Sequence, residues 1–169
     1  MAASPFGAPA TILASSVSLP TADIPAVAPP AFFVLGAALL APFLSRRVGH
    51  ALGFGAAGMV AIWSLLMPAG TYLPVTFLGF DAVLFNVDAF SRVMGVIFGL
   101  IGAAAVLYSY SSDARNRQTA FALGYVGTSL GSVFAGDWLT LLFFWELMAV
   151  TSTLLVWDYG GEAVRAGFR

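Results

Sequence analysis

One acidic residue differs from the others in the sequence because no other charge lies near it. Glu146 is part of the stretch FFWELMAV and is the only charged residue between Asp137 and Asp158. At 1.5 Å per residue, it lies roughly 13 Å inside an apolar segment. An ionised carboxylate near the centre of a membrane costs at least about 2.5–3.5 kcal/mol, and ionisable residues at that depth are by default functional. Glu146 is therefore the first candidate for chemistry.

Three states are open to a carboxyl group in such surroundings. Glu146 can be protonated, it can be ionised and paired with a cation on another helix, or it can alternate between these states as a proton carrier does. The structural alternative is a protonated Glu146 that makes one hydrogen bond between helices. On its helix face the one polar residue is Thr153, which offers a hydroxyl group and no charge. Because every arginine lies at or near the end of an apolar segment, we expect the partner of Glu146 to be another polypeptide or water.

Two further acids could support this residue. Asp88 and Asp137 each directly precede an apolar segment, a position typical of helix N-caps, whose side-chain oxygens accept hydrogen bonds from free backbone N–H groups. Ion binding is the alternative for each. Asp88 and Arg92 are also four residues apart, a spacing that allows an ion pair.

Other kinds of chemistry find no support in the sequence. The chain has no cysteine and one histidine, His50, and it shows no phosphate-binding loop, nucleophile motif or metal-ligand spacing. We therefore expect no cofactor, no metal and no catalytic site of an enzyme in the narrow sense. The net charge of −1 also argues against a nucleic-acid partner, because phosphate neutralisation requires clustered basic residues.

The composition is that of a membrane protein. Hydrophobic residues make up 60% of the 169 residues and charged residues 9%, with a mean hydropathy of +0.92. Soluble domains carry about 25% charged residues. We expect an all-α membrane domain over 24–157, preceded by a flexible extension over 1–23. Its five transmembrane helices are predicted at about 24–44, 51–67, 89–110, 119–135 and 138–157.

The connections predict how these helices are oriented. With five alternating crossings, six of the seven arginines fall on one side, which the positive-inside rule makes cytoplasmic. The N-terminus is then outside and the C-terminus cytoplasmic, and Arg92 is the exception that could snorkel to the outer interface. Residues 68–88 contain β-branched and aromatic residues around a turn signal at Gly79–Asp81, which predicts a short outer hairpin between the second and third helices, with an irregular interfacial loop as the alternative.

Small residues recur at four-residue spacing in two of the segments. Gly95 and Gly99 belong to the third segment, and Gly127 and Gly131 to the fourth. Such pairs let helix backbones approach closely in lipid, so we expect tight packing of the third and fourth helices. The alternative is that glycine is simply more common in membrane helices.

Two stretches of the sequence resemble a known family. FNVDAFSRVMGVIFGLIG and AGDWLTLLFFWELMAVTSTLLVW are similar to the N-terminal part of proton-conducting, antiporter-like membrane subunits. These include the large subunits of Mrp-type cation/proton antiporters, of which the D-type is nearest, and the antiporter-like subunits of respiratory complex I. The resemblance implies that Glu146 is the family's essential membrane glutamate, which works with a lysine on a later helix, and that Asp88 has a more structural role.

The family members carry many more helices than the five expected here. Residues 158–169 include EAVRAGFR, which resembles the cytoplasmic start of a truncated sixth helix, and the chain contains no lysine. We therefore expect a fragment or split subunit of a multisubunit antiporter for monovalent cations and protons. It would reside in lipid, in the bacterial cytoplasmic (inner) membrane, with other membrane subunits that include a chain supplying buried lysines. The alternatives are a proton-pumping subunit of a complex I-like NADH:quinone oxidoreductase, which would be part of a translocase, and a structural membrane protein without transport activity.

Overall fold

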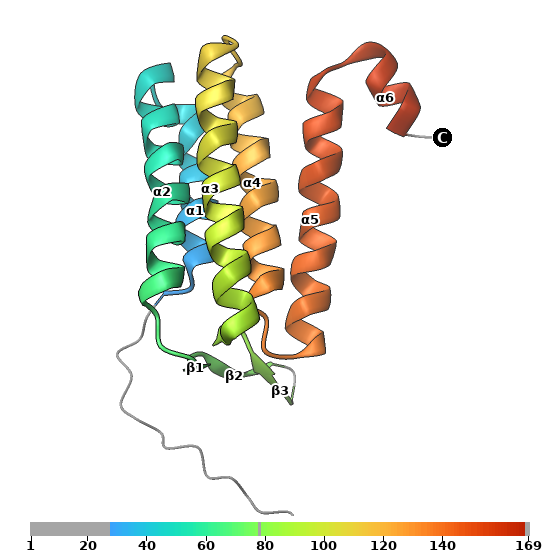
Figure 1. The fold of residues 1–169 in the computed structure, drawn as a ribbon. Coiled ribbons are helices and arrows are strands. Elements are labelled where there is room, and N and C mark those ends of the chain that lie inside the picture. Colours follow the sequence, from blue (N-terminus) through green and yellow to red (C-terminus); the bar gives the residue numbers. More distant parts are fainter. Residues whose placement is uncertain (1–27, 78, 168–169) are drawn as a thin grey trace, which may run out of the picture.

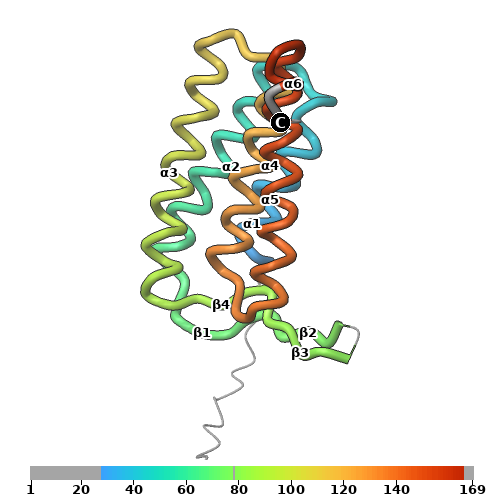
Figure 2. Tube along the Cα trace, turned by 90° about the vertical axis from the view of Figure 1, so that its right-hand side faces the viewer, coloured from blue at the N-terminus to red at the C-terminus, as the bar shows by residue number. Residues whose placement is uncertain are grey.

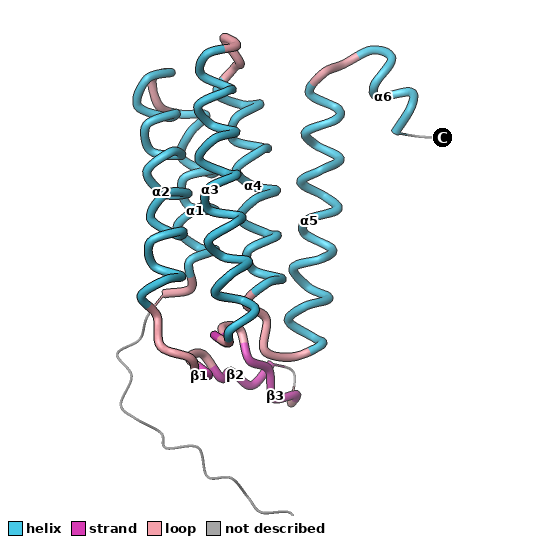
Figure 3. Tube along the Cα trace, in the orientation of Figure 1, coloured by secondary structure: helices cyan, strands magenta, loops and turns pink. Residues whose placement is uncertain are grey.

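Helices make up most of the described chain. The computed structural model describes residues 28–77 and 79–167, with helices that run side by side and short strands at one end (Figure 1, Figure 3). The predicted extension over 1–23 and the start of the first predicted segment lie outside these residues. The helices are α1 (Pro30–Leu40), the 3-10 helix η1 (Ala41–Phe43), α2 (Arg46–Leu66), α3 (Ala89–Ser111), α4 (Asn116–Val133), α5 (Trp138–Asp158) and α6 (Gly161–Gly167).

Three of these helices are long and apolar enough to cross a membrane. They are α2, α3 and α5, each of 21 to 23 residues. A shorter apolar helix covers Pro30–Phe43, and α4 has 18 residues that begin with the polar sequence Asn-Arg-Gln. By length and composition, the described part of the chain is a mostly helical membrane protein.

The helices pack in two groups that meet at α4. The helix α2 lies along α3, and α1 lies between α2 and α4 (Figures 1 and 2). On its other side α4 packs along α5, which stands at the edge of the bundle. The helix α5, which carries Glu146, therefore has a neighbouring membrane helix mainly on one side.

Glycines allow these close approaches, and most of the glycines that the sequence singles out serve other pairs of helices than α3 with α4. A Cβ atom at Gly99 of α3 would lie 2.7 Å from the backbone nitrogen of Ala61 in α2. Gly127 of α4 packs against α1, and Gly131 of α4 packs against the ring of Phe144 in α5. The expected glycine packing between α3 and α4 is found in part: a Cβ atom at Gly102 of α3 would lie 3.0 Å from Val126 of α4, but Gly99, Gly127 and Gly131 serve other pairs of helices. A row of glycines marks where a backbone can be approached, but the connections of the chain decide which helix approaches it.

Four short strands cover one end of the bundle, which we call the hairpin end. They are β1 (Gly70–Thr71), β2 (Pro74–Phe77), β3 (Phe80–Val83) and β4 (Asn86–Val87). The predicted hairpin is confirmed: β2 pairs antiparallel with β3, with Phe77 opposite Phe80, and Gly79 in the connection has φ of 83°, where glycine is favoured. Figure 2 shows β2 and β3 extending sideways from the bundle. The pairing of β1 with β4 was not predicted.

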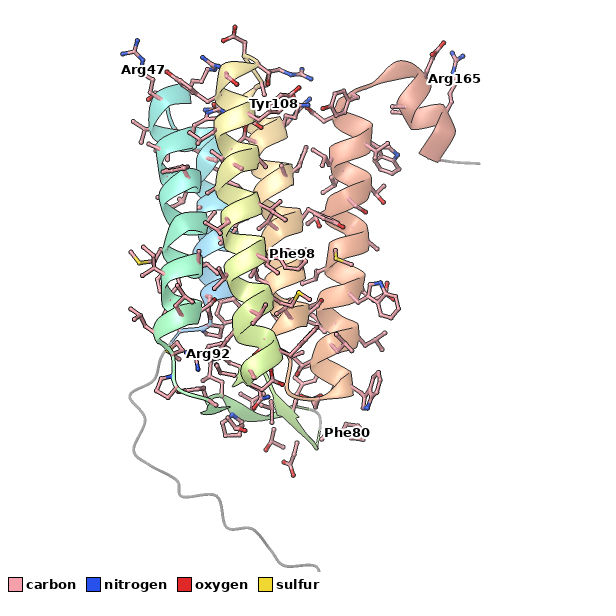
Figure 4. The ribbon with its side chains drawn as sticks, viewed as in Figure 1. Arg47, Phe80, Arg92, Phe98, Tyr108 and Arg165 are labelled. Atoms are coloured by element: carbon pink, nitrogen blue, oxygen red, sulfur yellow. The ribbon has the colours of Figure 1, made fainter. Side chains whose placement is uncertain are left out.

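Charged residues gather at the opposite end, which we call the arginine-rich end. Figure 4 shows Arg47 and Arg165 there, and Phe80 and Arg92 at the hairpin end. Arg92 does not pair with Asp88: its guanidinium donates to the carbonyl oxygens of Ser64 (3.3 Å) and Leu65 (2.7 Å). These carbonyls belong to the last turn of α2, where the helix offers them no N–H partner of its own. Arg92 therefore caps α2 with its side chain.

Candidate functional site

The first turn of α5 is held by one carboxylate. Asp137 accepts hydrogen bonds at Oδ1 from the backbone N–H groups of Leu139 (2.8 Å) and Thr140 (3.0 Å), as the predicted N-cap should. At Oδ2 it accepts from the Thr140 hydroxyl (2.7 Å) and from the backbone N–H of Val83 in β3 (2.5 Å). Burial raises the pKa of Asp137, but the four hydrogen bonds together outweigh it and hold that pKa below its ordinary value. Asp137 thus joins α5 to the hairpin.

Backbone hydrogen bonds reinforce this junction. The N–H of Gly136 donates to the carbonyl of Val83 (2.9 Å), and the N–H of Asn86 donates to the carbonyl of Phe134 (2.8 Å). The rings of Phe85 and Phe134 meet edge to face, with centroids 5.4 Å apart, and both are fully buried. The connection between α4 and α5 is therefore fixed against the strands at the hairpin end.

The other end of α5 is held by an ion-pair cluster. The carboxylate of Asp158 forms two ion pairs. Its Oδ1 lies 2.5 Å from a guanidinium nitrogen of Arg117, and its Oδ2 lies 3.2 Å from one of Arg115. The carboxyl group is 1% exposed, whereas both arginines are more than half exposed. Arg115 also donates to the Asp158 carbonyl (3.1 Å), which has no N–H partner within α5. The cluster ties the end of α5 to the start of α4.

Between these two ends, one side of α5 packs against α4. Phe144 lies on Gly131 and is 3% exposed. The hydroxyl oxygens of Thr151 and Thr128 are 3.3 Å apart, and the Ser129 hydroxyl donates to the sulfur of Met148 at 3.2 Å. Because Phe144, Met148 and Thr151 follow one helix face, these contacts fix the rotation of α5 about its own axis.

Glu146 lies on the opposite side of α5. At 100° per residue it is turned about 200° from both Phe144 and Met148, the residues that meet α4. Its side chain is exposed, and it makes no hydrogen bond or ion pair with any residue that the structure describes. Its neighbours one turn away, Leu142 and Val150, are 53% and 54% exposed. The carboxyl group thus lies at mid-length of the helix, on an exposed apolar face that no other described helix covers.

The structure does not gather the other predicted site residues around Glu146. The Thr153 hydroxyl donates to the carbonyl of Ala149 in its own helix (2.8 Å) and not to Glu146. Asp88 caps α3 in a capping box with Ser91, through bonds of 2.6 Å and 2.8 Å, and this confirms the predicted cap. Asp88 and Asp137 both lie at the hairpin end and do not contact Glu146. They can affect Glu146 only by positioning α3 and α5.

Sequence reasoning missed the role of Asp158. Arg115 and Arg117 indicated sidedness in the sequence, and the ion pair they share was not expected. The partners are 41 to 43 residues apart in the chain, so no local spacing joins them. The one signal was the position of Asp158 itself, an acid at the last residue of an apolar segment. In the part of the chain that the structure describes, no group of three or more His, Cys, Asp or Glu side chains could hold a metal ion.

Comparison with known proteins gives two distant relatives. The chain is 31% identical over 85 residues to the putative antiporter subunit mnhA2 of Staphylococcus epidermidis, an alignment that covers 46% of this chain and 11% of that protein. It is 29% identical over 126 residues to the A/B subunit of a probable K(+)/H(+) antiporter of Rhizobium meliloti, covering 63% of this chain and 12% of that protein. The chain is distantly similar to antiporter subunits. No protein-family description and no solved structure matches it.

The two alignments bear on a small part of each relative. The matched segments span about one-tenth of the length of the relatives. The ions that the whole relatives transport therefore cannot be assigned to this chain from the alignments. The similarity agrees with the resemblance to antiporter-like subunits, and with a transporter component in place of an enzyme. Neither of these two relatives is named a D-type subunit, and the nearness to that type stays a prediction.

Proposed function

We propose that this chain is a membrane component of a multisubunit antiporter for monovalent cations and protons, in which Glu146 takes part in moving them. The observation that carries the proposal is the position of Glu146 at mid-length of α5, exposed and unpartnered among the described residues. The distant similarity to antiporter subunits supports the transport class. The D-type subunit is the nearest type by the motif around Glu146.

In this proposal five helices cross the bacterial cytoplasmic membrane: the three long ones, α2, α3 and α5, and the two shorter ones, α4 and α1 continued by η1. The arginine-rich end is cytoplasmic and the hairpin end is outside, because short cytoplasmic connections carry an excess of arginine. Glu146 then lies near the middle of the hydrocarbon, where a charged carboxylate needs a partner or a proton. Its side of α5 meets other membrane subunits, one of which supplies a buried lysine.

The proposed mechanism is an alternation of partners. When Glu146 is ionised, it pairs with the cation of the neighbouring subunit, which offsets the cost of its charge in a low-dielectric surrounding. When it takes up a proton it becomes neutral, and the neighbouring cation is released to pass its own proton on. The clamps at Asp137 and Asp158 hold α5 in one rotation, so that the carboxylate stays on the side where the partner lies.

The test is Glu146→Gln in the reconstituted assembly, measured as cation-dependent proton flux. Glutamine keeps the shape and hydrogen-bonding ability but cannot titrate, so we expect the flux to fall at least tenfold, with assembly unchanged. Glu162→Gln is the matched control, because Glu162 is an exposed glutamate of α6 in the same chain and should leave the flux unaltered. Normal flux in Glu146→Gln would instead support a structural membrane protein in which Glu146 makes one hydrogen bond.

A further inference from the structure

A groove at the arginine-rich end lies far from Glu146 along the molecule. It runs between the start of α2 and the end of α3, with a volume of about 270 Å³. Its apolar lining includes Ala51, Phe54, Val106 and Leu107. Phe54 follows Arg47 by seven residues, so the groove reaches about 10 Å along the helices from its mouth. An apolar groove that opens between two membrane helices has the length and chemistry to take part of a lipid acyl chain.

Arg47 stands at the mouth of this groove without a counter-charge. It is exposed, and among the described residues its side chain makes no hydrogen bond or ion pair. Figure 4 shows it pointing away from the end of α2. The groove therefore combines a free cation at the arginine-rich end of the molecule with an apolar lining below it.

The neighbouring polar groups leave this cation available. Arg46 is already neutralised by Asp113, with nitrogen and oxygen 2.9 Å apart, and it packs over the ring of Tyr110. His50 has both ring nitrogens engaged, Nδ1 with the carbonyl of Arg46 (2.8 Å) and Nε2 with the hydroxyl of Thr119 (2.9 Å). No ion pair joins Arg47 to an acid among the described residues, so its charge remains free to attract an anion.

We propose that this groove binds one anionic phospholipid. The headgroup phosphate pairs with Arg47, and the first part of an acyl chain lies on Ala51, Phe54 and Leu107. Basic pockets between membrane helices on the cytoplasmic side bind anionic headgroups in this way, so the inference rests on the proposed cytoplasmic position of the arginine-rich end. A soluble phosphate would leave the apolar lining uncovered, so the geometry favours a lipid.

The experiment uses the full chain in bilayers that contain a photoactivatable phosphatidylglycerol or a photoactivatable phosphatidylcholine, each with the reactive group in the acyl chain. Labelled peptides are mapped by mass spectrometry. We expect the peptides that contain Phe54 and Leu107 to be labelled several-fold more by phosphatidylglycerol than by phosphatidylcholine. Arg47→Gln should reduce that ratio to about one, and Arg47→Lys should preserve most of it, since the ammonium group also attracts phosphate.

Two controls distinguish the site from general charge. Arg165→Gln removes one exposed arginine from the same end of the molecule but outside the groove, so it should leave the ratio unchanged. Ala51→Phe should fill the groove and lower labelling by both lipids. An unchanged ratio in Arg47→Gln would overturn the proposal. Loss of labelling on addition of millimolar glycerol phosphate would also overturn it, because the site would then be one for a soluble anion.

Discussion

The two sides of α5 differ although both are made largely of apolar residues. The side that faces α4 is close-packed, with Phe144 on Gly131, and it is fixed at both ends by Asp137 and Asp158. The opposite side exposes large apolar side chains and the single acid Glu146. One side thus holds the helix in its own chain, and the other is left for whatever surrounds that chain.

The contrast has a physical reason. Lipid is as apolar as leucine, so burial of apolar side chains does not drive helices together in a membrane, and close packing and polar contacts must do so. The α4-facing side has both kinds of contact. The Glu146 side has an acid whose exposure to lipid is costly and whose pairing with a cation would be specific. We therefore expect the first side to determine stability and the second to determine assembly.

The largest effect on stability is expected at Phe144, and the adjacent Phe143 is its matched control. Phe144 is 3% exposed and Phe143 is 58% exposed. Phe144→Ala leaves a cavity against α4, which should cost about 3 kcal/mol of unfolding free energy. Phe143→Ala leaves no cavity against α4 and removes one edge-to-face ring contact with Phe144, so it should cost about 1 kcal/mol or less. Thermal unfolding of the lipid-reconstituted chain measures both, and equal losses in the two variants would contradict the contrast between the sides.

A smaller effect is expected at the clamp of the hairpin end. Asp137→Ala removes a helix cap and the bond to Val83, which should cost about 1 kcal/mol at neutral pH. Because the folded pKa of Asp137 is lowered, its contribution is fully present above the ordinary pKa of an aspartic acid. It is lost as the pH falls through the lowered value. The difference in melting temperature between the variant and the wild type should therefore shrink below about pH 4.

The matched control for this clamp is Asp88→Ala. Asp88 caps α3 and has no bond to the hairpin from its side chain among the described residues. Hydrogen exchange at the backbone N–H of Val83 should accelerate in Asp137→Ala and stay unchanged in Asp88→Ala. If both variants accelerate that exchange equally, Asp137 does not act as the specific link between α5 and β3.

These elements also show which parts of the structure are readable from sequence. The caps at Asp88 and Asp137 were predictable because an N-cap bonds to backbone groups within three residues. The hairpin was predictable because its turn and strands are local. The Arg115–Asp158–Arg117 cluster was not, since its members come together only through the packing of two helices. The rotation of α5 about its axis was also not predictable from the sequence. Phe143 and Phe144 are the same residue type, and nothing local shows which of them meets α4.

Spin labels on α5 test directly whether another subunit covers the Glu146 side, and we expect them to have the smallest effect on the stability of the chain. The chain has no cysteine, so a nitroxide spin label can be attached at a single introduced site. A label at Leu142→Cys, one turn from Glu146, should be mobile in the isolated chain and immobilised in the complete assembly. A label at Met148→Cys, on the α4-facing side, should be immobile in both states, because α4 already covers it. If the label at position 142 is equally mobile in the chain and in the assembly, then lipid covers this side of α5. Glu146 then has no partner on a neighbouring subunit, and the alternation of partners proposed for it loses its basis.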